Sequence, residues 1–127
     1  MKDFKRYYII PATPEETYIA LTNPFTIELW TGYPAEMSEI VDSEFSLWEG
    51  DITGKNLLFE QNKKIVQEWY FGDQSEKSLV TIKIFENKKG SQVEVVHTNI
   101  PDDDFDNIVE GWDDFYFGAI ISFFEEE

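Results

Sequence analysis

The chain has 127 residues, 42% of them hydrophobic and 17% aromatic, which is enough for one domain with a core rich in aromatic rings. It contains no cysteine, so disulfides, thiolate catalysis and zinc sites built on sulfur are excluded. The formal net charge of -16 disfavours binding to nucleic acid and to anionic lipid, favours solubility, and would attract a basic partner or ligand.

The amino terminus, MKDFKRYYIIPAT, gives no sign of a targeting segment. Its apolar run is too short for a signal peptide, and it lacks a small-residue cleavage site. No other apolar run approaches the roughly 18 residues that a membrane span needs. We therefore expect a cytoplasmic protein that makes no membrane contact and forms a single domain over residues 1–127.

One strand and two short helices are predicted first. Residues 3–10, DFKRYYII, are rich in residues that favour strands. The sequence TPEE at 13–16 is typical of a helix start, because threonine can cap the helix, proline suits its first turn and the second glutamate completes a capping box. The pair NP at 23–24 repeats this signal and predicts a second short helix that ends near Gly32.

Six further strands are predicted between residues 37 and 98, separated by short turns. They cover residues 37–40, 44–48, 51–59, 64–71, 78–86 and 92–98. None of the connections is long enough for a crossover helix, so all strands are expected to be antiparallel. Within 51–59, Gly54 indicates a bulge or sharp bend that lets the sheet curl.

A long amphipathic helix is predicted at the end of the chain. Its acidic lead-in suits the positive end of a helix dipole. Eight apolar residues share one helical stripe: Phe105, Ile108, Val109, Trp112, Tyr116, Ala119, Ile120 and Phe123. One sheet with one face to cover, and one long helix to cover it, predict a two-layer α+β domain. A curved antiparallel sheet of about six to seven strands would wrap on the C-terminal helix, with a cavity between them.

Five segments in this order carry a resemblance to a known family: FSLWEGDITGKNL, KKIVQEWYF, SLVTIKIFE, VEVVHTNIP and a helix that contains Glu110-Gly111-Trp112 and Tyr116. Over nearly its whole length the chain resembles the C-terminal domain of the activator of the heat-shock-protein-90 ATPase, which belongs to the START-like helix-grip (SRPBCC) superfamily. The resemblance implies the helix-grip fold. It also implies a binding function, because the eukaryotic co-chaperone contacts the chaperone and other members of the superfamily bind apolar ligands between sheet and helix.

Two functional hypotheses follow. The first is a non-enzymatic domain that holds an apolar or amphipathic small molecule between the sheet and the C-terminal helix, in a cavity lined by Trp69, His97, Trp112 and Tyr116. The alternative is a co-chaperone-like interaction module that acts on the heat-shock-protein-90 chaperone in the stress response. No enzyme and no cofactor are expected, because nothing in the sequence pairs a nucleophile with a base.

His97 is the only histidine and is predicted at the end of the last strand. There it could bind a polar ligand head or move a proton. No serine or acid is tied to it by local spacing, which favours the simpler interpretation of a hydrogen-bonded structural histidine. We therefore assign no catalytic residue.

The acidic run DDDFDN, residues 102–107, is similar to the first part of a calcium-binding loop. Three of its aspartates match the first ligand positions, but Asn107 replaces the glycine at the sixth position, and Asp113 stands where a glutamate is required. The helical stripe also begins inside the supposed loop. We therefore interpret the run as a solvated helix start and expect no metal site.

Four apolar side chains are predicted to contact a partner: Trp48, at the hairpin corner WEGD, and Phe117, Ile121 and Phe124, on the outer side of the long helix. The last three lie roughly 100–160° from the centre of the inner stripe and form a second stripe. A helix that is apolar on both sides is usually buried on both sides. Its cover would be another part of the chain, a second copy in a homodimer, or a partner.

Overall fold

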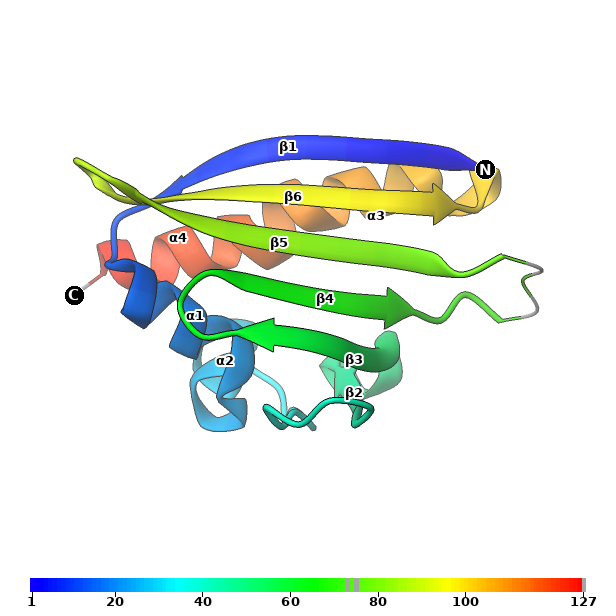
Figure 1. Ribbon diagram of the computed structural model, residues 1–127, viewed down its shortest axis with the longest axis horizontal. Coiled ribbons are helices and arrows are strands. Elements are labelled where there is room, and N and C mark those ends of the chain that lie inside the picture. The colour runs from blue at the N-terminus through cyan, green and yellow to red at the C-terminus, as the bar shows by residue number, and fades with distance from the viewer. Residues whose placement is uncertain (73, 75, 127) are drawn as a thin grey trace.

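A computed structural model describes residues 1–72, 74 and 76–126 of the chain (Figure 1). The chain begins with strand β1 (Lys2–Ile10) and helices α1 (Pro14–Thr22) and α2 (Pro24–Thr31). Five strands follow: β2 (Glu44–Leu47), β3 (Ile52–Glu60), β4 (Lys64–Trp69), β5 (Ser78–Asn87) and β6 (Gly90–Ile100). A long helical segment ends the chain, composed of α3 (Phe105–Glu110), a π-helical turn (Gly111–Tyr116) and α4 (Phe117–Glu125).

Within the described part of the chain, six strands form one antiparallel sheet in the order β1-β6-β5-β4-β3-β2. Figure 1 shows α3 and α4 running behind β1, β6 and β5, along one face of the sheet. Helix α1 contacts β5 and β6, and α2 contacts α4. The predicted α+β architecture, with two short helices after the first strand and a long helix at the end, is therefore confirmed.

The prediction of a strand at residues 37–40 is wrong. A single isolated bridge, between Glu36 and Ser46, joins this segment to β2. The chain then turns, because the Ser43 amide donates to the Ile40 carbonyl oxygen at 3.1 Å. This turn takes the segment out of the sheet, so six of the seven predicted strands are present in the described residues.

Both predicted helix starts are confirmed. The Thr13 hydroxyl accepts from the Glu16 amide at 3.1 Å, and the Glu16 carboxylate accepts from the Thr13 amide at 3.0 Å. The Asn23 side-chain oxygen accepts from the amides of Phe25 and Thr26. These caps satisfy backbone donors that the first helical turn leaves free, so each helix begins at its proline.

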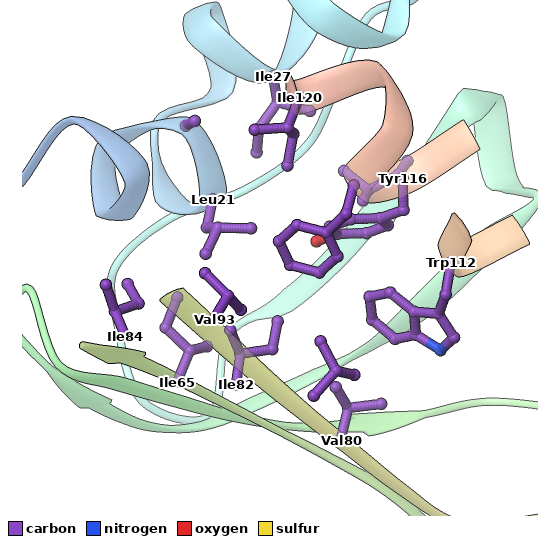
Figure 2. Close-up of a cluster of buried hydrophobic side chains, with 14 of the residues drawn as sticks. Leu21, Ile27, Ile65, Val80, Ile82, Ile84, Val93, Trp112, Tyr116 and Ile120 are labelled. Carbon is purple, nitrogen blue, oxygen red and sulfur yellow. The ribbon is translucent and has the colours of Figure 1, made fainter. Parts of the chain in front are cut away.

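The core lies between the inner face of the sheet and the helices. Residues two apart on a strand share a face, and the inward-facing apolar residues of β5 and β6 are buried. In Figure 2 the sheet residues Ile65, Val80, Ile82, Ile84 and Val93 lie opposite the helical residues Leu21, Ile27, Trp112, Tyr116 and Ile120. Full burial of each large apolar side chain stabilises the fold by roughly 1.5–3 kcal/mol.

Gly54 lies inside β3 and is needed for close packing. Its backbone pairs with β2 on one side and with β4 on the other. A Cβ atom here would lie 2.0 Å from the Glu68 carbonyl oxygen and 2.8 Å from the Phe45 ring, so position 54 has no room for a side chain. The bulge predicted at Gly54 lies a little further on, where the register of the β3–β4 pairing shifts between Asn56 and Leu58.

The C-terminal helix contains a π-helical turn, where a regular α-helix was predicted. The Phe117 amide donates to the Trp112 carbonyl oxygen, five residues earlier. On a regular α-helix, side chains five residues apart point about 140° away from each other. Here the Trp112 and Phe117 rings are stacked with centroids 5.8 Å apart. The wider turn therefore brings both rings onto the inner face of the helix.

Gly118 makes room for this wider turn. A Cβ atom on residue 118 would lie 2.4 Å from the Asp113 carbonyl oxygen, five residues earlier. Glycine costs a helix about 1 kcal/mol relative to alanine. At this position the cost is offset because a larger residue would collide with the carbonyl that the π turn brings close.

Candidate functional site

The four side chains predicted around a cavity lie together between the sheet and the C-terminal helix. Trp69 ends β4, His97 lies on β6, and Trp112 and Tyr116 come from the π-helical turn. The Trp69 and Trp112 rings are stacked with centroids 4.7 Å apart, and the Tyr116 ring centroid lies 4.6 Å from that of Trp112. All four side chains are buried. The rings therefore fill this part of the interior through contact with one another.

His97 belongs to a chain of hydrogen bonds. The Trp112 indole N–H donates to His97 Nδ1 at 3.1 Å, so the ring proton is on Nε2. Nε2 donates to Ser78 Oγ at 2.8 Å, and the Ser78 hydroxyl donates to the Thr98 carbonyl oxygen at 3.0 Å. Burial lowers the pKa of His97 to about 3, so the imidazole is neutral at neutral pH.

The Ser78–His97 contact has the residue types and the distance of a nucleophile–base pair. Both side chains are fully buried, however, and the serine proton is bonded to a backbone carbonyl. An imidazole with a pKa of about 3 is too weak a base to take a proton from serine at neutral pH. The geometry therefore supports a structural role for His97.

The neutral state of His97 leads us to expect an acid-sensitive fold. In the unfolded chain the imidazole takes up a proton near pH 6.5, and in the folded chain only near pH 3. As the pH falls through this window the unfolded state binds one more proton, so stability is lost. Between pH 7 and 4.5 the parent should lose about 2–3 kcal/mol more than His97→Gln, measured by urea unfolding. Equal losses in the two proteins would contradict the neutral, buried imidazole.

A pocket of about 570 Å³ opens beside the ring cluster. The β2–β3 corner, the end of β4 and the first half of the C-terminal helix line it, through Trp48, Asp51, Ile52, Trp69, Asn107, Ile108, Gly111, Trp112, Phe115 and Tyr116. Three of the four residues predicted around a cavity therefore face this pocket. His97 does not line it, because its ring lies against Trp69 and Trp112 inside the core.

The β2–β3 corner has an unusual backbone. Trp48, Glu49 and Gly50 have φ angles of 50°, 55° and 98°, and the Asp51 amide donates to the Trp48 carbonyl oxygen at 3.2 Å. A left-handed conformation costs a residue with a side chain roughly 1–3 kcal/mol, so its surroundings must hold it in place. The half-buried Trp48 ring packs edge-on against Trp30, with centroids 5.8 Å apart, and this contact fixes the corner.

The side chains predicted to contact a partner are only partly accessible. Phe117 is fully buried and stacks on Tyr8 with ring centroids 4.7 Å apart. Its prediction as a surface contact is wrong, because the π turn rotates it inward. Trp48, Ile121 and Phe124 are half buried and pack against the core. Much of the second apolar stripe is therefore covered by the chain itself.

Other large apolar side chains are more exposed than these. On α2, Phe25 is 76% exposed and Leu29 is 69% exposed. They are four residues apart, on the side of the helix opposite the buried Ile27 and Trp30. Neither residue was predicted as a contact, although their spacing is visible in the sequence and indicates an apolar face on each side of α2.

The acidic run before the C-terminal helix forms part of its start. Asp102–Asp104 make a 3₁₀ turn, and α3 begins at Phe105. The amino group of Met1 pairs with the Asp102 carboxylate at 2.8 Å. Among the described residues, no three His, Cys, Asp or Glu side chains are grouped closely enough to hold a metal ion. In the same residues no helix combines the length and the apolar character that crossing a membrane requires.

Comparison with known families identifies the relationship. The sequence pattern of the family described as activator of Hsp90 ATPase homolog 1-like protein matches residues 11–124. The chain belongs to this family. The match confirms the resemblance seen in the sequence and covers both the ring cluster and the residues that line the pocket.

Relatives of this Hsp90-activator-like chain are longer than the chain itself. It is 32% identical over 103 residues to the activator of 90 kDa heat shock protein ATPase homolog of Dictyostelium discoideum, which covers 79% of the chain and 27% of that protein. It is 26% identical over 110 residues to homolog 1 of Homo sapiens, which covers 85% of the chain and 32% of that protein. The chain thus spans about a third or less of these curated relatives.

Solved structures of other proteins share the fold of this family member. An HSP90 activator from Plasmodium falciparum has a TM-score of 0.85 and 24% identity, over 93% of this chain and 92% of that one. The Aha1 dimer from Colwellia psychrerythraea has a TM-score of 0.80 and 18% identity, again over 93% and 92%. At such identities the likeness shows the helix-grip fold alone.

Proposed function

We propose that the chain is a non-enzymatic interaction domain that acts on the Hsp90 chaperone. The observation that carries the proposal is the family match over residues 11–124, together with 32% identity to a relative named as an activator of the Hsp90 ATPase. Because the chain spans 27% of that relative, the proposal concerns what this one domain contributes, namely contact with the chaperone and, through that contact, a faster hydrolysis of ATP by the chaperone.

Two features support binding through the outer surface. Between the sheet and the C-terminal helix, the rings of Trp69, Trp112 and Phe117 are stacked on one another and occupy the space. On the outside, Phe25 and Leu29 expose apolar surface on adjacent turns of α2. Exposed apolar side chains grouped in this way often mark a contact with another protein. The proposal therefore puts the chaperone contact on the outer face of α2.

The charge of the chain indicates what the partner surface should be like. A net charge of -16 attracts a basic surface and speeds the encounter with it. Salt screens this attraction over about 10 Å at 0.1 M ionic strength. We therefore expect binding to weaken as the salt concentration rises.

Sedimentation velocity of the chain mixed with purified Hsp90 tests the proposal. The chain should co-sediment with the chaperone, and Phe25→Ser/Leu29→Ser should weaken binding about tenfold or more, because a few buried apolar anchors dominate most interfaces. Tyr7→Thr/Ile9→Thr is the matched control, since it removes two exposed apolar side chains from β1. It should bind as the parent does.

Each alternative outcome has a definite meaning. If the parent does not co-sediment at low salt, the chain does not bind the chaperone by itself and the proposal fails. If both double variants bind as the parent does, the contact lies away from α2. Runs of the chain alone at low and at moderate salt concentration test self-association, because salt screens the repulsion between two chains of net charge -16 and should strengthen a homodimer. If the parent stays monomeric at both salt concentrations, the homodimer hypothesis is excluded.

A second candidate is the binding of an apolar or amphipathic small molecule. The observation that favours it is the pocket of about 570 Å³, since small-molecule sites typically measure roughly 300–1,000 Å³. The site would lie beside the ring cluster, with Trp69, Trp112 and Tyr116 as its inner wall. It shares no residue with the outer face of α2, so the two functions are compatible.

A further inference from the structure

Two of the three tryptophans that line the pocket, Trp69 and Trp112, have no free polar group to offer a ligand. The Trp69 indole N–H donates to Gln67 Oε1 at 3.0 Å, and the Trp112 indole N–H donates to His97 Nδ1 at 3.1 Å. Both donors are therefore engaged inside the protein (Figure 2 shows Trp112 projecting into the core). Because these two rings are also stacked on one another and almost fully buried, they give the pocket an apolar inner wall.

The charge among the residues that line the pocket is negative. Among the described residues that line the pocket, Asp51 is the only charged one, and it is exposed at the β2–β3 corner. Tyr116 remains neutral, because burial raises the pKa of its hydroxyl above the ordinary value. The chain as a whole carries a net charge of -16. An anionic ligand is therefore repelled from this pocket, and a cation is attracted to it.

We propose that the pocket binds a small organic cation, an alkylammonium group on a short apolar chain. Aromatic faces attract such a cation through their negative quadrupole, and Trp48 and Phe115 stand in the lining together with the Asp51 carboxylate. The apolar chain would pack against Ile52 and Ile108, which also line the pocket. Two accessible aromatic rings, one carboxylate and no basic side chain among the described lining residues are the chemistry that selects this class of ligand.

The site goes beyond the proposed contact with the chaperone and does not depend on it. Its lining comes from the β2–β3 corner, the end of β4 and the C-terminal helix, and includes no residue of α2. Binding can be measured on the isolated full chain. Failure of the chaperone experiment and failure of the ligand experiment are therefore separate results.

The experiment compares three probes that share a six-carbon chain: hexyltrimethylammonium, 1-hexanol and hexanoate. Each is titrated into the full chain at low ionic strength, and binding is measured by calorimetry and by tryptophan fluorescence. The cation should bind about tenfold more tightly than the alcohol, because ring faces and a carboxylate favour it over a neutral head group. Hexanoate should bind most weakly, since the chain repels it.

Two pairs of variants locate the binding site. Asp51→Asn should weaken binding of the cation about five- to tenfold and leave that of 1-hexanol unchanged. Glu49→Gln makes the same change of charge two residues away, outside the lining, and should change the affinity less than about twofold. Phe115→Ala should weaken binding of the cation. Phe25→Ala removes an exposed ring that does not line the pocket, and it should leave this binding unchanged.

Three results would overturn the proposal. If 1-hexanol binds as tightly as the cation, the pocket has no preference for charge. If Asp51→Asn and Glu49→Gln have equal effects, the cation responds to the general negative charge of the chain. If none of the three probes binds at millimolar concentration, the pocket is not a ligand site.

Discussion

Replacing Phe117 with alanine is expected to lower the free energy of unfolding by about 3–5 kcal/mol. The Phe117 side chain is fully buried, and its ring stacks on those of Tyr8 and Trp112. Truncation leaves a cavity that the surrounding core closes only in part. Urea unfolding followed by tryptophan fluorescence measures the loss. On a regular α-helix residue 117 would face outward, and the same substitution would cost little.

Phe115→Ala is the matched control for this substitution. It removes the same ring two residues earlier, from a side chain that is 59% exposed. Substitutions at exposed positions usually change stability by no more than about 0.5 kcal/mol. If Phe115→Ala lowers the free energy of unfolding as much as Phe117→Ala does, or more, the π turn does not turn Phe117 toward the core.

The other large effect is expected for Trp112→Ala. Loss of the buried indole should cost about 3–5 kcal/mol, and the loss of its N–H should add about 1–3 kcal/mol, because His97 Nδ1 is left without a donor in the core. The indole also stacks on Trp69 with ring centroids 4.7 Å apart, so the variant should loosen the end of β4 as well. Urea unfolding at neutral pH measures the total.

Trp112→Phe separates the two contributions. It keeps an aromatic ring and removes the N–H donor, so most of its cost, about 1–3 kcal/mol, should come from the unpaired His97 nitrogen, with a smaller contribution from the lost ring volume. In a double-mutant cycle with His97→Gln the two losses should not add, because the residues share one hydrogen bond. A Trp112→Phe variant as stable as the parent would show that the hydrogen-bond chain through His97 contributes nothing.

Local patterns in the sequence were sufficient for most of the fold. The capping box at Thr13 and the asparagine cap at Asn23 act over three residues, so the chain reveals them without knowledge of distant contacts. The alternation in β5 and β6 has the period of a half-buried strand, and both strands form as predicted. The acidic start of the last helix is equally local.

The π turn could not be read from the same patterns. It depends on the fit of Trp112 and Phe117 against the sheet and on the absence of a side chain at Gly118, and a helical period of 3.6 residues conceals both. The prediction that Phe117 faces outward failed for this reason. The prediction of a strand at residues 37–40 failed for a related reason, because a hydrogen-bonded turn at Ile40 overrides the strand preference of these residues.

The candidate site was predictable in part. Trp69, His97, Trp112 and Tyr116 were expected around one cavity because of the helix-grip resemblance and the inner stripe of the helix, and their rings do lie together. The hydrogen-bond partner of His97 was not predictable, because Ser78 lies 19 residues away along the chain and meets it only through the pairing of β5 with β6. Asp51 lines the pocket because of the left-handed corner before it, which the sequence marks only as a turn.

The rate of ATP hydrolysis by purified Hsp90, measured with increasing amounts of the chain, tests the proposed function most directly. If the domain acts on the chaperone, the rate should rise to a plateau as the chain is added, and Phe25→Ser/Leu29→Ser should require more protein to reach it. A rate that stays constant up to a large molar excess of folded chain would contradict the proposal that this domain acts on the chaperone.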